Sequence, residues 1–127
     1  MKKIISIDRL LKISAKKKIV LCHGVFDVVH FGHLSHFTAS KKFGDILVVS
    51  ITEDKFVNKG PGRPVFNSKI RASFLSNLSC VDYVIVNNSK TPINLIKKLK
   101  PNFYSKGTDY KDSKKDITGE INNEIKA

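Results

Sequence analysis

The chain has 127 residues, of which 41% are hydrophobic, and this is room for a single domain with one core. Its two cysteines are too few for a disulfide scaffold, and no stretch resembles a secretion signal or a membrane span, so we expect a cytoplasmic protein with reduced thiols. The formal net charge of +12 would attract polyanions, but the lysines are scattered as pairs and triples, which favours a solvated surface over a nucleic-acid footprint.

The hydrophobic pattern predicts helices and strands that alternate up to residue 107. In chain order we expect a helix at 6–17, a strand at 18–23, a loop at 24–31, a helix at 32–44, a strand at 45–52, a short helix from 53, a break at 60–64, a helix at 68–80, a strand at 81–86, a helix at 91–100 and a short strand within 101–107. Ser6 or Asp8 can cap the first helix, and the two glycines and two prolines of the break exclude regular structure there. The polar tail after Gly107 could form one more helix.

The predicted strands are continuous apolar runs, as is typical of strands buried on both faces of a parallel sheet. Their alternation with helices predicts an α/β fold, a Rossmann-like doubly wound parallel sheet in a single domain. Ligands of such sheets bind outside the carboxyl ends of the strands. The stretch HGVFDVVHFGH, residues 23–33, follows the first predicted strand and therefore lies where a ligand is expected.

Four histidines fall within 14 residues of this region, namely His23, His30, His33 and His36. A zinc site is one interpretation, but no cysteine or clustered carboxylate completes a tetrahedral set nearby. A purely structural role is a second. The third, which we favour, is phosphate binding: Gly32 lets the backbone approach an anion, a helix N-terminus offers N–H donors, and imidazoles donate hydrogen bonds to phosphate oxygens.

Residues 24–37, GVFDVVHFGHLSHF, resemble the signature of the cytidylyltransferase-like nucleotidyltransferases. The HxGH element of that family is present at 30–33, and its G-x-F-D element is present at 24–27. Residues 51–71 resemble the segment that carries phosphate-binding basic residues, and residues 103–110 resemble the K-G-x-D-Y element of the heptose 1-phosphate adenylyltransferases. This last element and the KGPGRP run favour the sugar-phosphate branch, and the resemblance covers roughly residues 17–112.

The resemblance implies transfer of AMP or CMP from a nucleoside triphosphate to a phosphorylated sugar or alcohol, with release of pyrophosphate. It implies catalytic contacts to phosphate from His30, His33 and Lys59. It implies nucleotide contacts from Gly24, Val25, Phe26, Asp27, Gly32, Arg63 and Arg71, and acceptor contacts from Lys106 and Asp109. Mg²⁺ is expected to arrive with the triphosphate rather than in a protein cage.

Several of these assignments have an alternative. Asp27 could brace its loop instead of touching a ligand or metal, Lys59 and Arg63 could belong to a solvated basic turn, and Arg71 could be a surface arginine. The sequence does not choose between ATP and CTP.

Two other functions stay open. The first is a nucleotide-binding regulatory or fused module without chemistry of its own. It is suggested by the family's later S-[ST]-T-containing segment, which does not occur before Ala127. We therefore expect the domain at 1–127 to lack that C-terminal part. The second is nucleic-acid binding through the +12 charge, which the absence of any recognised motif disfavours. We expect no membrane partner, and homodimerisation is raised because members of the family are commonly dimers.

Overall fold

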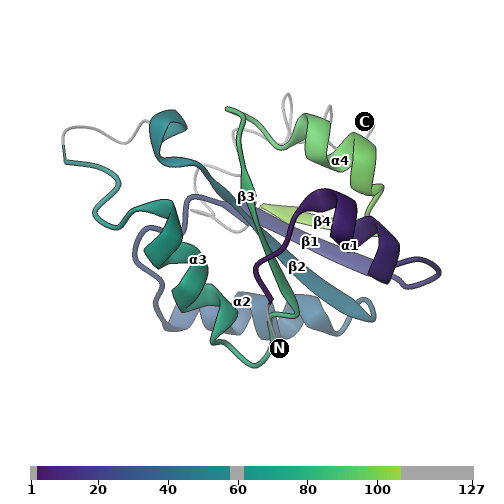
Figure 1. Cartoon of the computed structure of the whole chain (residues 1–127). Helices are drawn as coiled ribbons and strands as arrows, with labels where there is room; N and C mark the ends of the chain where they lie inside the picture. Colours follow the sequence, from purple (N-terminus) through teal and green to yellow (C-terminus); the bar gives the residue numbers. More distant parts are fainter. Residues whose placement is uncertain (1–2, 58–61, 107–127) are drawn as a thin grey trace, which may run out of the picture.

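A computed structural model describes residues 3–57 and 62–106 of the chain. Its centre is a sheet of four parallel strands in the order β3-β2-β1-β4 (Figure 1). The strands are β1 (Ile19–Gly24), β2 (Ile46–Thr52), β3 (Tyr83–Asn87) and β4 (Phe103–Lys106). Each lies within two residues of its predicted start, and β1 and β2 are buried along their whole length, as continuous apolar runs predict.

Helices cover both faces of this sheet. They are α1 (Ile7–Ile13), α2 (Phe31–Lys41), α3 (Ser68–Ser76) and α4 (Ile93–Leu99), with a 3-10 turn, η1 (Asp54–Phe56), after β2. In Figure 1, α2 and α3 lie on one side of the sheet, and α1 and α4 lie on the other. The predicted doubly wound α/β fold in a single domain is thus confirmed.

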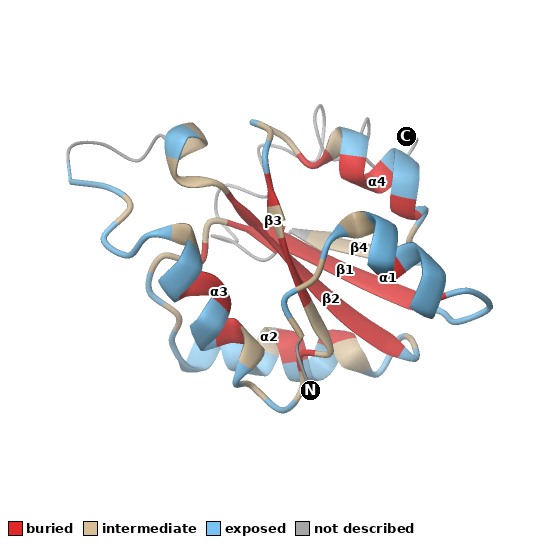
Figure 2. Cartoon of the chain, in the orientation of Figure 1, coloured by how far each residue is buried: buried red, intermediate tan, exposed pale blue. Residues whose placement is uncertain are grey.

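The core is divided by the sheet into two clusters, since successive side chains of a strand point to opposite faces. In β2, Leu47, Val49 and Ile51 pack toward α2 and α3, whereas Ile46 and Val48 pack toward α1 and α4. Figure 2 shows the strands of this central region as the most buried part of the molecule.

The helix boundaries differ from the predicted ones chiefly at the C-terminal ends, since α1 ends at Ile13 rather than at residue 17 and α2 ends at Lys41 rather than at residue 44. The first predicted helix is capped by Ser6, whose side chain accepts the N–H of Arg9. Helix α2 begins at Phe31, one residue early, because His30 caps it. Helix α3 ends at Ser76 rather than at residue 80.

The apolar residues of α3 mark only part of its buried face. Ile70 and Phe74 are 51% and 52% exposed, and the face toward the sheet is made by Arg71, Ala72 and Leu75. A buried arginine therefore occupies a position that periodicity would give to an aliphatic residue.

The order of the strands identifies the edge of the sheet at which a ligand is expected. The connections from β1 to β2 and then to β3 run toward one edge of the sheet, and β4 then pairs with the other side of β1. This change of direction makes the carboxyl end of β1 the switch point at which open α/β sheets bind ligands. The loop 25–30 and the N-terminus of α2 lie there. Among the described residues, no helix has the length and apolar character needed to cross a membrane.

Candidate functional site

The side chains of His30 and His33 cap the N-terminus of α2 by accepting hydrogen bonds from backbone N–H groups. The His30 Nδ1 atom accepts a hydrogen bond from the Gly32 N–H at 3.0 Å, and the His33 Nδ1 atom accepts one from the His30 N–H at 3.1 Å. The arrangement is a reciprocal capping box in which imidazoles replace the usual hydroxyl and carboxylate. The two ring centroids are 4.1 Å apart.

These hydrogen bonds determine the chemistry that the rings present. A ring nitrogen that accepts an N–H carries no proton, so a neutral His30 or His33 is protonated on Nε2. Each neutral ring then carries its N–H donor on Nε2, at a helix N-terminus where the helix dipole favours negative charge. This combination suits an anion.

Gly32 is required by the fit of His30. A Cβ atom at position 32 would lie 2.8 Å from His30 Cε1 and 3.1 Å from its Nδ1. Any side chain there would push the capping ring away, and this is the physical reason for a glycine between the two histidines.

The ring of Phe26 packs against His33 of the histidine pair. Its ring is 3% exposed and meets the His33 ring edge-on at a centroid distance of 5.6 Å and the Phe37 ring at 5.2 Å. Its φ of 50° lies in the left-handed region, which is uncommon for an aromatic residue and turns the loop sharply after β1. The ring contact with nucleotide that the motif implies stays a prediction.

The Asp27 carboxylate is bound by a segment that lies about forty residues later in the chain. It accepts the N–H of Val65 at 2.7 Å and of Phe66 at 2.9 Å, and the Arg63 guanidinium at 3.2 Å. Burial alone would raise the pKa of Asp27, but the backbone N–H groups of Phe66 and Val65 and the Arg63 guanidinium outweigh it and hold the pKa below its ordinary value. Asp27 is therefore a carboxylate at neutral pH. Its observed contacts are those expected if Asp27 braces its loop, which is the alternative raised from the sequence.

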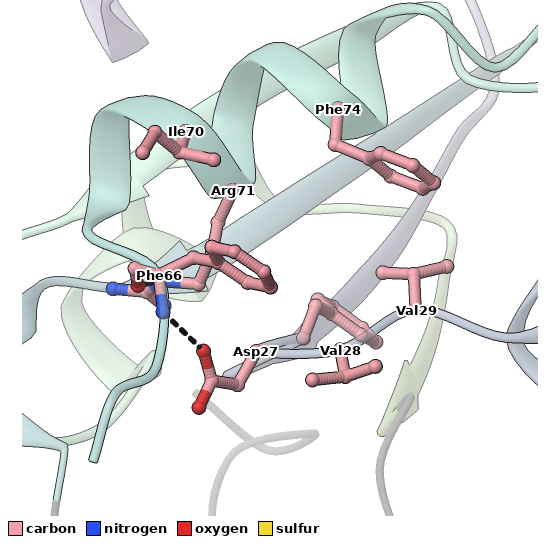
Figure 3. A pocket seen from close by; sticks show the side chains of 8 residues that line it. Asp27, Val28, Val29, Phe66, Ile70, Arg71 and Phe74 are labelled. Atoms are coloured by element: carbon pink, nitrogen blue, oxygen red, sulfur yellow. Dashed lines mark hydrogen bonds between the residues drawn. The ribbon is translucent and has the colours of Figure 1, made fainter. Parts of the chain in front are cut away.

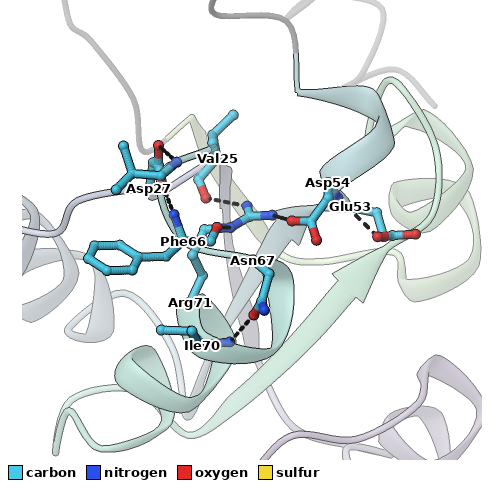
Figure 4. Close-up of polar contacts among 9 residues, drawn as sticks. Val25, Asp27, Glu53, Asp54, Phe66, Asn67, Ile70 and Arg71 are labelled. Carbon is cyan, nitrogen blue, oxygen red and sulfur yellow. Dashed lines mark hydrogen bonds and ion pairs between the residues drawn. The ribbon is translucent and has the colours of Figure 1, made fainter. Parts of the chain in front are cut away.

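Arg71 is 2% exposed and joins three segments (Figure 4). It donates to the Phe66 carbonyl at 3.0 Å, to the Val25 carbonyl at 2.8 Å and to the Asp54 carboxylate at 2.5 Å. The alternative of a surface arginine is wrong, since the side chain is among the most buried of the described residues. Its predicted nucleotide contact stays untested, and its guanidinium is directed at protein groups.

The other predicted residues that the structure describes lie around the same edge. Gly24 ends β1 opposite Ile51, and the backbone of Lys106 pairs beside His23. Lys59 and Asp109 lie outside the described residues. Arg63 is 44% exposed at its side chain, next to Asp27.

Two histidines without an assigned role occupy defined places. His23 is buried, with its Nδ1 atom 2.6 Å from the Ser50 hydroxyl, and His36 connects α2 to β4 through a 2.8 Å contact with the Ser105 hydroxyl. Sequence reasoning missed these partners, because strand register pairs His23 with a residue 27 positions away, and the packing of α2 beside β4 brings His36 to one 69 positions away. Among the described residues, no three His, Cys, Asp or Glu side chains come together as a metal site.

A mainly apolar cavity of about 310 Å³ lies between the β1–α2 loop and α3 (Figure 3). Its lining residues are Phe26, Asp27, Val28, Val29, Phe66, Ile70, Arg71 and Phe74. The exposed apolar residues of α3 thus border a hollow beside the site.

Comparison with known proteins identifies relatives of this arrangement. The family model described as cytidylyltransferase-like matches residues 21–125. A bifunctional protein HldE of Campylobacter fetus is 44% identical in an alignment 128 positions long, which covers 98% of this chain and 28% of the relative. One of Helicobacter pylori is 44% identical in an alignment 110 positions long, which covers 85% of this chain and 24% of the relative. The chain therefore spans about a quarter of the length of these curated relatives.

A solved structure shares the fold. The crystal structure of the lipopolysaccharide core biosynthesis protein from Thermoplasma volcanium is similar with a TM-score of 0.64 and 27% identity, over 80% of this chain and 87% of that one.

Proposed function

Because the chain belongs to the cytidylyltransferase-like family, we propose that it transfers a nucleoside monophosphate from a nucleoside triphosphate to a phosphorylated sugar and releases pyrophosphate. The observation that carries this proposal is the pair of imidazoles that cap the N-terminus of α2 through Nδ1, which leaves the N–H of each neutral ring on Nε2. Such a site stabilises the negative charge that develops on a phosphoryl group.

The resemblance of residues 103–110 to the sugar-phosphate branch supports ATP as the donor and a sugar 1-phosphate, of the heptose class, as the acceptor. Similarity to the bifunctional HldE proteins and to a protein of lipopolysaccharide core biosynthesis supports an acceptor that is a sugar. CTP as the donor is the alternative that the experiment below distinguishes.

The reaction is an in-line displacement. An oxygen of the acceptor phosphate forms a bond to the α-phosphorus of the triphosphate, and the bond from that phosphorus to the bridging oxygen breaks, so that pyrophosphate leaves with the electron pair. The acceptor phosphate is ionised at neutral pH, so no side chain needs to remove a proton. The histidines contribute alignment and neutralisation of charge in the transition state.

Mg²⁺ would supply further neutralisation of the triphosphate. The described residues bring no three candidate ligands together, so the cation would be held mainly by phosphate oxygens and water. Asp27 is not well placed for it, because its carboxylate is occupied by donors from residues 63–66.

The test is pyrophosphate release, with ATP and CTP crossed against sugar 1-phosphates and alcohol phosphates. His33→Ala should slow turnover by about 10²-fold or more, as expected for the loss of one transition-state donor. His33→Asn is the matched variant: an amide oxygen can still accept the His30 N–H and preserve the cap, while the Nε2 donor is gone.

We expect His33→Asn to unfold at the wild-type temperature and to be as slow as His33→Ala. Normal turnover of either variant would contradict the catalytic assignment. Binding of triphosphate without turnover of any acceptor would favour the binding module instead.

A further inference from the structure

The main chain at Phe66 is held from two sides. Its N–H donates to the Asp27 carboxylate at 2.9 Å, and its carbonyl accepts from the Arg71 Nε atom at 3.0 Å. The neighbouring N–H of Val65 donates to the other oxygen of Asp27 at 2.7 Å. Because Asp27 belongs to the β1–α2 loop and Arg71 to α3, these contacts fasten residues 65–66 between the two elements that border the site (Figure 4).

Both charged groups of this clamp are directed at protein partners. The Asp27 side chain is 7% exposed and that of Arg71 is 0% exposed. Arg71 also holds the Val25 carbonyl, so it fixes the start of the loop that carries Asp27. The two backbone N–H groups stabilise the Asp27 carboxylate in its charged form, and Arg71 pairs with Asp54.

Arg63 is attached to the same clamp but differs from it. Its side chain is 44% exposed, and its 3.2 Å contact is the longest of the three that Asp27 accepts. A phosphate with more negative charge can draw this guanidinium from Asp27, because arginine binds phosphate through two parallel donors. The backbone bonds to Val65 and Phe66 would remain during that exchange.

We propose that Asp27 and Arg71 are positioning residues that clamp the main chain at Val65 and Phe66 and thereby place Arg63 to receive the triphosphate. This inference rests on the proposed function for its ligand, whereas the clamp itself is a property of the chain alone. In this proposal Asp27 does not contact the nucleotide, as the family motif implied, but acts on it by positioning Arg63.

The test is Asp27→Asn in the full chain. The amide has one acceptor oxygen where the carboxylate has two, so it cannot hold both N–H groups. Amide hydrogen exchange at Val65 and Phe66, followed by NMR, should become about tenfold faster or more. The KM for triphosphate should rise about tenfold while kcat changes little, because Arg63 contributes binding rather than chemistry.

Asp45→Asn is the matched control. The Asp45 carboxylate also accepts a backbone N–H, that of Lys18 at 2.9 Å, but it lies at the opposite end of β1. Asp45→Asn should leave the amide hydrogen exchange of Val65 and Phe66 unchanged, and likewise the KM for triphosphate. Arg71→Lys, which preserves the charge but not the three-way contact, should reproduce the faster exchange of Asp27→Asn.

A double-mutant cycle shows whether Asp27 acts through Arg63. Arg63→Ala should raise the KM by itself, and adding Asp27→Asn should raise it no further. Unchanged exchange in Asp27→Asn would overturn the clamp, as would an increased Mg²⁺ requirement without faster exchange, which would mark Asp27 as a metal contact. If the wild type shows no turnover, the proposed function fails, and the exchange measurement still decides whether the clamp exists.

Discussion

Two backbone N–H groups decide which nitrogen of each imidazole carries the proton at the start of α2. The Gly32 N–H occupies His30 Nδ1, and the His30 N–H occupies His33 Nδ1. A tetrahedral metal site would need further ligands beside these two rings, and the described residues contain no group of three His, Cys, Asp or Glu side chains that could hold a metal. The two histidines cap a helix, as the structural interpretation of the sequence expects, and their binding of phosphate stays a prediction.

We predict that both rings, when neutral, are the Nε2–H tautomer. Long-range proton–nitrogen correlation spectra at alkaline pH distinguish protonated from unprotonated ring nitrogens, and Nδ1 of both residues should have the shift of an unprotonated nitrogen. In Gly32→Ala, the added Cβ displaces the His30 ring. His30 should then populate both neutral tautomers, and its Nδ1 shift should move toward that of a protonated nitrogen. An Nδ1–H form of His33 in the wild type would contradict the capping geometry.

The sequence was sufficient to place the loop and the helix start of this site. A glycine between two histidines after an apolar run predicts an anion site at a helix start; the anion stays a prediction, and both histidines do lie at the N-terminus of α2. The partners of Asp27 and Arg71 could not be predicted in the same way. Most are backbone groups, which have no signature in residue type, and those that connect the β1–α2 loop with residues 65–71 lie 38–46 positions apart along the chain.

At the scale of elements, strands were easier to predict than helix faces. Continuous apolar runs require burial on both sides, so β1 and β2 follow directly from composition. In α3 the buried face contains Arg71 beside Leu75, while Ile70 and Phe74 border a cavity, so apolar periodicity identifies only part of the buried face. Arg71 can be buried there because three protein groups accept its hydrogen bonds.

The attachment of α2 to β4 should depend on pH. Burial lowers the pKa of His36 below its ordinary value of 6.5, and His36 contacts the Ser105 hydroxyl of the edge strand at 2.8 Å. A folded-state pKa below the unfolded one means that the unfolded chain binds the proton more readily. The contribution of neutral His36 to stability is therefore complete above about pH 6.5 and is lost as the pH falls below it.

His36→Gln retains a side chain that can contact Ser105 but does not titrate. We expect its free energy of unfolding at pH 8 to lie within about 1 kcal/mol of the wild type. Between pH 7 and pH 5, the wild type should lose stability relative to the variant, as measured by urea denaturation at each pH. Parallel pH profiles for the two proteins would show that His36 does not contribute this dependence.

At the scale of the whole molecule, the sheet separates two cores that share no side chain. Ile51 belongs to the cluster under α2 and α3, where the site lies, and Ile96 of α4 belongs to the cluster on the opposite face. Both are buried, with 0% and 4% exposure. Because the strands between them are rigid and fully hydrogen-bonded, a loss of packing on one face should not propagate to the other.

Ile51→Val and Ile96→Val test this separation. Each removes one buried methylene and should lower the free energy of unfolding by about 0.5–1.5 kcal/mol. In the double variant the two losses should add to within about 0.5 kcal/mol, as is typical of distant sites without shared partners. Urea denaturation of the four proteins measures this, and a coupling of about 1 kcal/mol or more would mean that the sheet transmits strain between its faces. In that case, changes beneath α1 and α4 would reach the histidine pair through β1, and substitutions far from the site could not serve as inert controls for it.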